Sequence, residues 1–555
     1  MNKKPVLAFL IIVSIALLTG CNYADETTVA KYFDNRKAAI ALNFDTELYM
    51  IMIHSGGGYN PENAAIRAQR TLVGWPNIIA DCETYGIPVS FNICGYEAVF
   101  GDAGRREVND IDIYQTWHVD YWETHTWYSD MPWTSANYKT VGDLSGYTRS
   151  YGLVYGGPLT ERTMNSAVPF EISYHNFGHE KLGSITADNM NNTFRLGVAY
   201  HKRIGSKLTA ESPPWDSNPQ SSKYPIYVQN GIFVFNRSEG AMSEPYEVIE
   251  DLWIIPRNGS FTAASNLTSV IDSAIADEKV LAYYSHPENG FHGSDRSAFQ
   301  TSLAYAKSKV DSGELWAATL SEIGRYWEAK SDVRPDTTIV DSNTTAVSII
   351  LSNYDAQRFG IPYLTFITTM PNAAAYAKIT VDYPSIQTFN SDAARIVDTN
   401  VIYTIYLNPT GETCVEIKGI DTPYTDGVSI NMPVLTVDST PPVSPFADMP
   451  ITIEAEANST DSIYSVNIIY QRNDDAKDSK VMDYNNGTWQ TTIGPFIPGD
   501  FIHYYVSVTD NSGRRERSAD KSFITGFSIY DLDILNGNWL NTEPNIKAIS
   551  TMIGL

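Results

Sequence analysis

The pattern of the sequence changes near Lys330, and this change limits the chain to a small set of architectures. Before it, short apolar segments such as 38–44 and 89–94 alternate with stretches of helical spacing such as 61–85. Strands that alternate with helices form parallel sheets or barrels, and their functional side chains gather at the carboxyl ends of the strands. We therefore expect an α/β domain over residues 36–330.

After this change the apolar segments are short, rich in β-branched and aromatic residues, and separated by Asn, Asp, Gly and Pro. This pattern is typical of all-β sandwiches. Two such modules are expected at 335–438 and 443–527, joined by a linker at 438–442. The second resembles the immunoglobulin-like modules of extracellular enzymes and contains a predicted hairpin turn at 484–489. The sequence assigns no structure to the tail at 528–555.

The start of the chain predicts export. Two lysines precede an apolar run at 6–18, which is too short to span a bilayer and has the length of a secretory signal. We expect a signal peptide at 1–20, and its end, Leu-Thr-Gly-Cys, resembles the lipobox of prokaryotic lipoproteins. Lipidation of Cys21 would anchor the exported protein to the cell membrane or cell surface, with 21–35 as a polar tether. An ordinary signal peptide that ends in cysteine is the alternative.

The charge of the chain excludes one class of partner. Acidic residues outnumber basic residues 64 to 39, which gives a net charge of -25. A surface of that sign repels phosphate backbones, so nucleic acid is not an expected partner. Export permits disulfides. Cys82 and Cys94 could form one, although the sequence does not establish it, and Cys414 is expected to be buried and inert.

Three short segments of the first domain carry acids and histidines. Asp45 and Glu47 follow the first strand, and residues i and i+2 of an extended segment point to the same side. His175 and His179 are four residues apart, so they can converge on one metal from a helix or a loop. His286 ends a late strand. Taken singly, each of these residues is better explained as a solvated strand end or as a surface or satisfied core residue.

The order of these segments resembles that of the polysaccharide deacetylase (NodB-homology, carbohydrate esterase) family over residues 36–330. Residues 170–179 are similar to the H-E-I-G-x-H-T-x-x-H stretch of that family, 87–95 to its second strand, and 315–327 to its closing segment. The resemblance implies a distorted (β/α) barrel of NodB type, here followed by two all-β sandwich modules. It also implies metal-dependent deacetylation of an N- or O-acetylated polysaccharide at the cell surface.

The resemblance further implies roles for individual residues. Glu47, His175 and His179 are expected to bind a divalent metal, with zinc as the expected ion. Asp45 is the expected catalytic base, which takes a proton from metal-bound water as that water attacks the acetyl carbonyl. His286 is the expected acid, which protonates the leaving group.

The chain also departs from the family pattern. Thr46 stands where many members have a metal-binding aspartate, so Glu47 is expected to replace it. The loop at 211–215 lacks the arginine that usually orients the base. Either Arg257 or Arg237 supplies that charge from elsewhere in the chain, or the pKa of the base is set in another way. A catalytically inactive, saccharide-binding lipoprotein is therefore the alternative. A glycoside hydrolase, which needs two carboxylates about 5–10 Å apart, ranks last because it leaves the histidine pair without a role.

An insert before the histidine pair is rich in aromatic residues, with eight between Tyr114 and Tyr138. Flat apolar rings with polar edges stack on sugar faces, and rings that lie close together can form a saccharide platform. The rings could instead anchor the insert to the barrel. The residues expected to bind the polysaccharide are Trp117, Trp122, Trp127 and, in a later loop, Trp215.

Overall fold

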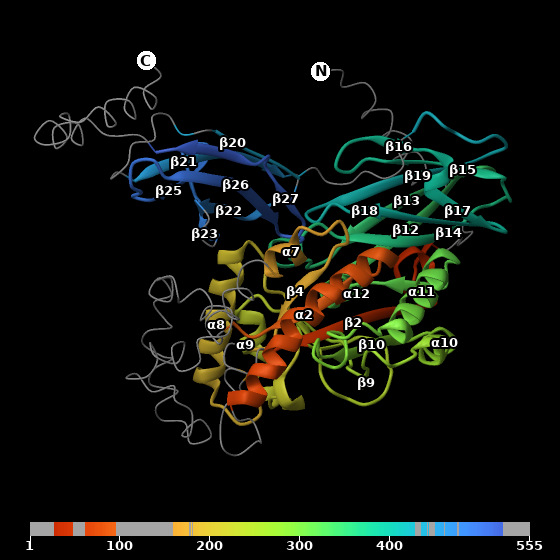
Figure 1. The fold of residues 1–555 in the computed structure, drawn as a ribbon. Helices are drawn as coiled ribbons and strands as arrows, with labels where there is room; N and C mark the ends of the chain where they lie inside the picture. Colours follow the sequence, from red (N-terminus) through yellow and green to blue (C-terminus); the bar gives the residue numbers. More distant parts are fainter. Residues whose placement is uncertain are drawn as a thin grey trace, which may run out of the picture. The chain divides into compact units, whose positions relative to one another are not determined.

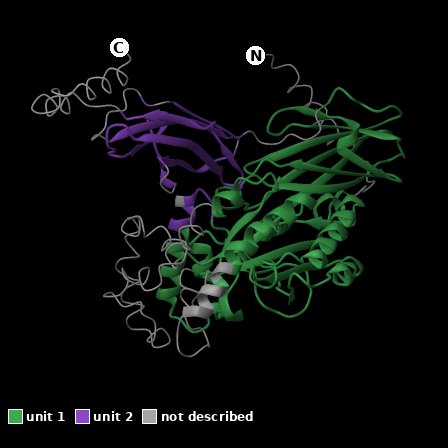
Figure 2. Cartoon of the chain, viewed as in Figure 1, with its two compact units in different colours: residues 1–198, 208–433 green, residues 199–207, 434–555 purple. Residues whose placement is uncertain are grey.

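The computed structural model describes part of the 555-residue chain: residues 27–47, 61–95, 159–176, 179, 181–427, 435–440, 442, 450–459, 461–473 and 477–525. The chain forms two compact units, shown in green and purple in Figure 2. The first comprises 1–198 and 208–433, and the second 199–207 and 434–555. Among the described helices, none has the length and apolar character needed to cross a bilayer. Four of the residues singled out above lie outside the described ranges: Cys21, Trp117, Trp122 and Trp127.

The first unit contains a ten-stranded sheet with the order β7-β8-β6-β5-β4-β3-β2-β10-β9, and β11 also pairs with β2. Figure 1 labels β2, β4, β9 and β10 of this sheet. Every described pair in this sheet is parallel except β7 with β8. This mixed α/β fold is compatible with the predicted distorted barrel. The strands are β2 (Ala38–Thr46), β3 (Val89–Ile93), β4 (Glu171–Tyr174), β5 (Ala210–Glu211), β6 (Val234–Phe235), β7 (Tyr246–Ile249), β8 (Leu252–Ile254), β9 (Gly259–Ser260), β10 (Val280–Ser285) and β11 (Leu315–Ala317).

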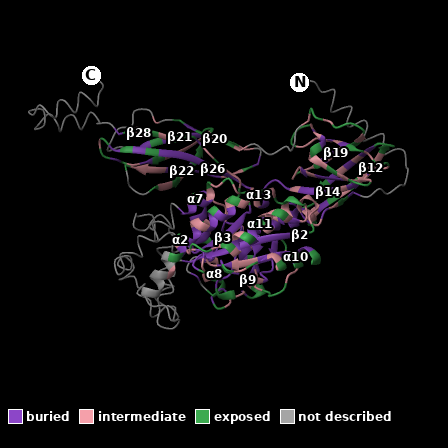
Figure 3. Ribbon diagram, turned by 45° about the vertical axis from the view of Figure 1, so that its right-hand side comes forward, coloured by how far each residue is buried: buried purple, intermediate pink, exposed green. Residues whose placement is uncertain are grey.

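The central strands are apolar along most of their length because they are covered on both faces. All nine residues of β2 and all five of β3 are buried, which Figure 3 shows in purple. Parallel strands enclosed on both faces have this nearly continuous apolar sequence, without alternation. Asn43, Asp45 and Asn92 interrupt the runs, and these three polar residues lie toward the carboxyl ends of their strands.

Helices connect the strands of this sheet and pack against it. Among them, α10 contacts β2 and β10, α11 contacts β11, and α12 contacts β6 and β8. A capping box begins α12, since Thr319 and Glu322 each accept a hydrogen bond from the other's backbone N–H. The helices are α2 (Pro61–Tyr85), α7 (Thr160–Met164), α8 (Ala187–Ile204), α9 (Tyr224–Gln229), α10 (Thr268–Asp277), α11 (Ser297–Asp311), α12 (Leu320–Asp332) and α13 (Ala356–Phe359), with short 3-10 turns at Phe33–Asn35, Pro214–Asp216, Ser221–Lys223 and Ser391–Ala393.

Two antiparallel sheets follow the α/β sheet in the first unit, with the orders β1-β14-β18-β17 and β12-β13-β19-β15-β16. One hydrophobic core joins them to the α/β sheet, because the same cluster contains Ala39 of β2, Trp327 of α12 and Phe366 of β14. The strands are β1 (Thr27–Val29), β12 (Val333–Asp341), β13 (Thr344–Leu351), β14 (Tyr363–Thr369), β15 (Tyr376–Val381), β16 (Gln387–Phe389), β17 (Ala394–Val397), β18 (Asn400–Tyr406) and β19 (Glu412–Ile420).

The predicted tether at 21–35 was wrong for its described part. Residues 27–29 form β1, which pairs antiparallel with β14, and a 3-10 turn follows at Phe33–Asn35. A strand of three residues is too short to show the alternation by which a strand is recognised in a sequence. The structure also decides the open question of a disulfide and corrects the expected burial of Cys414. Cys82 and Cys94 are buried but not bonded to each other, and Cys414 is only half-buried.

The second unit consists of two antiparallel sheets, with the orders β20-β21-β25-β24 and β23-β22-β26-β27, and β28 pairs with β26. Its predicted hairpin turn is confirmed, because Asn486 (φ 50°) and Gly487 (φ 94°) connect β24 to β25 as a two-residue loop. The predicted linker was wrong for 438–440, which belong to β20. The strands are β20 (Leu435–Thr440), β21 (Ile451–Ser459), β22 (Ile463–Arg472), β23 (Asp478–Val481), β24 (Asp483–Asn485), β25 (Thr488–Ile493), β26 (Phe501–Asp510), β27 (Arg515–Arg517) and β28 (Lys521–Ile524).

Candidate active site

The carboxyl ends of three strands bring the sequence-predicted residues together. Asp45 lies near the end of β2, and Glu47 follows that strand. His175 follows β4, and His286 follows β10. Because β10, β2, β3 and β4 are neighbours and run parallel, these ends lie along one edge of the sheet.

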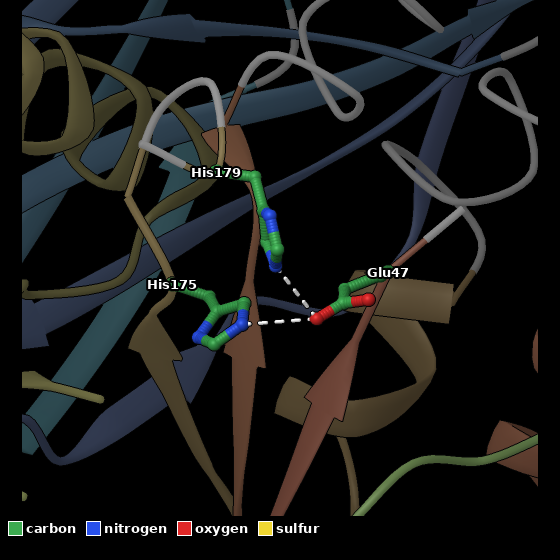
Figure 4. A group of neighbouring side chains, drawn as sticks. All are labelled: Glu47, His175 and His179. Carbon is green, nitrogen blue, oxygen red and sulfur yellow. Dashed lines mark hydrogen bonds and ion pairs between the residues drawn. The ribbon is translucent and has the colours of Figure 1, made fainter. Parts of the chain in front are cut away.

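Glu47 makes the closest contacts of the cluster. Its Oε1 atom lies 3.0 Å from Nε2 of His175 and 2.8 Å from Nε2 of His179 (Figure 4). All three residues are buried, and one ligand atom from each lies within 4.8 Å of the others. Two imidazole nitrogens and a carboxylate oxygen are a common set of protein ligands for zinc.

The hydrogen bonds of His175 determine which of its nitrogens faces this cluster as an acceptor. Nδ1 lies 2.7 Å from the carbonyl oxygen of Ser212, and a carbonyl only accepts, so Nδ1 carries the hydrogen. In the neutral ring, Nε2 then directs a lone pair toward Glu47 Oε1. Two acceptors 3.0 Å apart require a cation or a shared proton between them. This donor set therefore fits a divalent metal, and the contact with Ser212 is the kind that orients a metal-binding histidine.

The electrostatics of the cluster also favour a positive charge where its ligand atoms meet. Burial lowers the pKa of His175, but the carboxylates of Asp45 and Glu47 outweigh burial and raise it above its usual value. Burial raises the pKa of Glu47, but the charge of His179 and hydrogen bonds with the histidines bring it well below its usual value. Burial lowers the pKa of His286, but Glu47 and other nearby carboxylates raise it to about 9.

The two oxygens of Asp45 have different surroundings. Oδ1 accepts a hydrogen bond of 2.7 Å from Nδ2 of Asn92. Oδ2 lies 3.6 Å from Nη1 of Arg257 and 4.0 Å from Nε2 of His286. The Nδ1 atom of His175 also lies 3.8 Å from Oδ1. The carboxylate is thus buried between Asn92 and His175 on one side and Arg257 and His286 on the other.

Arg257, and not Arg237, lies beside Asp45. Its guanidinium donates to Oγ of Ser212 at 3.0 Å and to the carboxylate of Asp216, and it lies 4.3 Å from the ring centre of Tyr284. Arg237 instead forms a half-exposed ion pair with Glu239. The positive charge beside the expected base therefore comes from the segment after β8 (Leu252–Ile254).

A pocket of about 300 Å³ opens at this edge of the sheet. Trp215 is 43% exposed on its wall, in the left-handed backbone region (φ 59°), with its ring 5.1 Å from that of His179. Of the residues expected to bind substrate, Trp215 is the one within the described ranges, and it lies at the pocket. The lining residues are Asp45, Glu47, Arg67, His175, His179, Pro213, Trp215, Asp216, Arg257, Tyr284, His286, Glu288 and Asn289.

Some of the residues around the site were not singled out in the sequence. Asn92 carried a detectable signal, because it is polar within the apolar run of β3. Its pairing in register with Asp45 is visible only in the structure. Ser212, Asp216 and Tyr284 carried none, since loop serines and aspartates and strand tyrosines are common on any protein surface. Their positions follow from how the loops fold over the sheet edge.

A scan against protein-family models and a search of curated proteins gave no match. A search of solved structures found a Mycobacterium smegmatis protein described as a polysaccharide deacetylase, with 12% identity, 54% of this chain and 92% of that chain covered, and a TM-score of 0.35. A CE4 family pseudoenzyme from Bacillus anthracis has 8% identity, covers 52% and 66% of the two chains, and gives a TM-score of 0.26. A structure named BhCBM56 has 16% identity, coverage of 17% and 95%, and a TM-score of 0.13. TM-scores of this size do not by themselves establish a common fold.

Proposed function

We propose that this protein is a metal-dependent hydrolase that removes acetyl groups from an N- or O-acetylated polysaccharide at the cell surface. The observation that carries the proposal is the convergence of Glu47, His175 and His179 in one pocket with Asp45 and His286. A ligand set, a carboxylate and a protonated imidazole are the groups that metal-assisted hydrolysis of an amide or ester requires.

The proposed metal ligands are Glu47, His175 and His179, and zinc is the proposed ion. A divalent metal bound there supplies Lewis acidity, which polarises the acetyl carbonyl and makes water more acidic. The protein itself supplies the ligand orientation, through the contact between His175 and the carbonyl of Ser212.

Asp45 and His286 are proposed to move the protons. Asp45, through Oδ2, takes one proton from water as the oxygen of that water bonds to the acetyl carbon. The imidazolium of His286 gives a proton to the leaving nitrogen or oxygen as the bond from that atom to the acetyl carbon breaks. The products are acetate and an amino sugar or a free hydroxyl. Proton transfer by a positioned side chain typically contributes 10²–10⁴-fold.

A polysaccharide substrate is supported by the position of Trp215. The indole ring is exposed at the pocket wall beside His179, so a sugar stacked on it would be held next to the proposed metal ligands. Trp117, Trp122 and Trp127 are proposed to extend this contact, although they lie outside the described residues.

The inactive alternative rested on two departures from the family pattern. Thr46 stands in place of the metal-binding aspartate of many family members, but Glu47 lies within hydrogen-bond distance of both histidines and can replace it. Arg257 lies 3.6 Å from Asp45 although the loop at 211–215 has no arginine. Both observations favour the active enzyme over the silent saccharide-binding protein.

Metal analysis combined with an acetate-release assay tests the proposal. The purified protein without its signal peptide is expected to hold stoichiometric zinc and to release acetate from at least one member of a panel of acetylated glycans. A His175→Ala, His179→Ala double variant should lose both the zinc and the activity. His503→Ala, which changes an exposed histidine of the second unit, should keep both. A zinc-loaded protein that releases no acetate from any panel member would leave the saccharide-binding alternative.

Anchoring through a lipid on Cys21 is proposed separately, on the resemblance of 18–21 to a lipobox. In a bacterial host fed a labelled fatty acid, the wild-type protein is expected to carry the label and to sediment with membranes. A Cys21→Ser variant should lose the label. If that variant kept the label, the modification would lie elsewhere.

A further inference from the structure

We infer that Asn92 is a positioning residue that determines which oxygen of Asp45 faces the pocket, and that Asn43 and Ser173 hold its amide in the required orientation. The inference rests on the proposed function, since it gives Asp45 the role of base. It concerns a row of uncharged polar side chains beneath the pocket.

The row crosses three neighbouring strands at one level. Asp45 of β2 is paired in register with Asn92 of β3, and Asn92 is paired with Ser173 of β4. Side chains at paired positions of neighbouring parallel strands point to the same face of the sheet. Asn43 lies two residues before Asp45 and thus on this face as well. Asn43, Asn92 and Ser173 are fully buried, so their orientation depends on protein partners.

The hydrogen bonds of the row have only one consistent direction. Nδ2 of Asn43 donates to the backbone carbonyl of Tyr283 at 3.0 Å, and a carbonyl can only accept. Oδ1 of Asn43 therefore faces Asn92, and Nδ2 of Asn92 donates to it at 3.1 Å. The second hydrogen of the same Nδ2 goes to Oδ1 of Asp45 at 2.7 Å. On the other side, the hydroxyl of Ser173 donates to Oδ1 of Asn92.

This direction prevents Asn92 from turning over. A flipped amide would place its oxygen against Oδ1 of both Asp45 and Asn43, and acceptors that face one another in a buried site are strongly unfavourable. The amide therefore always presents its NH₂ group to Asp45. Because a hydrogen bond to a charged carboxylate is strong, Oδ1 stays engaged. Oδ2 is the oxygen left toward Arg257 and His286, on the pocket side.

A purely structural role for the row makes a different prediction. Buried polar groups need partners wherever they are, so removing any of them costs stability. Only a positioning role makes the chemical step depend on Asn92. Ser90 is the matched control, because it lies two residues earlier in β3, is equally buried, and donates to the carboxylate of Glu171 at 2.6 Å. Ser90 makes no contact with Asp45 among those recorded for the described residues.

The experiment compares kcat, KM, zinc content and melting temperature for the wild type and three variants. Asn92→Leu keeps the branched shape of the side chain, although it is larger, and removes both donors, and kcat should fall about 100-fold, the loss that a small misplacement of a reacting group causes. Ser173→Ala removes one of the two groups that orient the amide, and kcat should fall three- to tenfold. KM and zinc content should stay within twofold in both. Ser90→Ala should lower the melting temperature and leave kcat within twofold.

The inference is overturned if folded Asn92→Leu and Ser173→Ala proteins, with normal zinc content, keep wild-type kcat. If Asn92→Leu does not fold, the test is the kcat of Ser173→Ala compared with that of the control Ser90→Ala. A crystal structure of the Ser173→Ala protein gives a readout without activity. A weakened or rotated Asn92–Asp45 contact supports the inference, and an unchanged contact contradicts the role of Ser173. A wild-type protein that releases no acetate counts against the proposed function instead, and the structural comparison still tests the row.

Discussion

At the scale of single residues, the positive charge beside Asp45 is the guanidinium of Arg257, which three partners hold in place. Arg257 lies 3.6 Å from Oδ2 of Asp45, and its guanidinium is fixed by Ser212, by the carboxylate of Asp216 and by the face of Tyr284. Opposite charges about 4 Å apart interact by roughly 4 kcal/mol at an effective dielectric constant of 20. A charge of this size beside a buried carboxylate fixes the direction in which that carboxylate points.

Arg257→Ala is therefore expected to lower kcat about 100-fold with little effect on zinc content. Arg257→Lys should be intermediate, because an ammonium keeps the charge but loses the planar fork that reaches Ser212 and Asp216 together. The measurement is steady-state kinetics on whichever acetylated glycan the wild type accepts. Arg237→Ala is the control and should stay within twofold of the wild type. Equal losses in the two alanine variants would contradict the assignment of the charge to Arg257.

At the scale of elements, α2 and the loop that carries His286 approach each other unusually closely. A Cβ atom on Gly74, in the middle of α2, would lie 2.2 Å from the backbone carbonyl oxygen of Pro287. Glycine inside a helix usually costs about 1 kcal/mol relative to alanine. At this position only glycine leaves room for the carbonyl of Pro287. Because Pro287 directly follows His286, the packing of α2 and the position of His286 are coupled.

Gly74→Ala should consequently destabilise the protein, although the same change in an open helix would stabilise it. The carbonyl of Pro287 would have to move by about 1 Å or more, and misplacement of that order at a catalytic group costs roughly 100-fold in rate. We expect a lower melting temperature together with a fall in kcat, measured by thermal unfolding and acetate release. A variant that is more stable and fully active would show that this contact does not exist in solution.

A second contact between elements involves the carboxyl of Glu328, whose pKa lies close to neutral pH. The carboxyl of Glu328 on α12 accepts a hydrogen bond of 2.6 Å from the indole of Trp253 on β8. Burial raises the pKa of this carboxyl, and the hydrogen bond from the indole lowers it. The nearby carboxylates of Asp251, Asp332 and Glu247 raise it further, so that the pKa is about 8. In the unfolded chain the same carboxyl titrates near its ordinary value, so between about pH 4.5 and 8 the folded protein holds a proton that the unfolded chain has lost.

A raised folded-state pKa means that this contribution to stability is complete below pH 4.5 and disappears as the pH rises through 8. Relative to a Glu328→Gln variant, the wild type should lose on the order of 2 kcal/mol of unfolding free energy between pH 5 and 8. Urea unfolding of both proteins across this range measures the difference. Parallel pH profiles would mean that Glu328 is ionised in the folded state at neutral pH.

Several elements could be predicted from the sequence because their patterns are local. The helix expected at 61–85 matches α2, and the strand expected at 38–44 matches the start of β2. The proximity of Glu47 to a histidine pair that begins 128 residues further along the chain was also predicted, from a family resemblance. Asn92 and Asp216 could not be assigned roles, because those depend on strand register and on loop folding.

At the scale of the whole molecule, the α/β sheet shares a hydrophobic core with the two antiparallel sheets that follow it, here called the sandwich. The sequence pattern had predicted a domain boundary between them at 330–335. Helix α12 contacts β6 and β8 on one side and β14 of the sandwich on the other. The hydroxyl of Tyr326 in α12 donates to the backbone carbonyl of Ala30, directly after β1, at 2.9 Å. Trp316, Trp327 and Phe366 belong to the same buried cluster. Part of the apolar core of the α/β domain is therefore shared with the sandwich.

Truncation tests this shared core. A chain that ends at residue 330 loses the sandwich strands that cover α12 and exposes large apolar side chains, which promotes aggregation. We expect residues 22–330 to be insoluble or to show no cooperative unfolding. Residues 22–433 keep the shared core and every residue of the pocket, so they should fold, bind zinc and release acetate with a kcat close to that of residues 22–555.

The longer truncation should still be somewhat less stable than residues 22–555, because residues 199–207 at the end of α8 cluster with the second unit. The comparison is made by circular dichroism, thermal unfolding, metal analysis and kinetics on all three chains. A soluble, active 22–330 fragment would mean that the barrel folds alone and that the sandwich only rests against it. An inactive but folded 22–433 chain would assign the second unit a direct part in catalysis, which no residue of the pocket suggests.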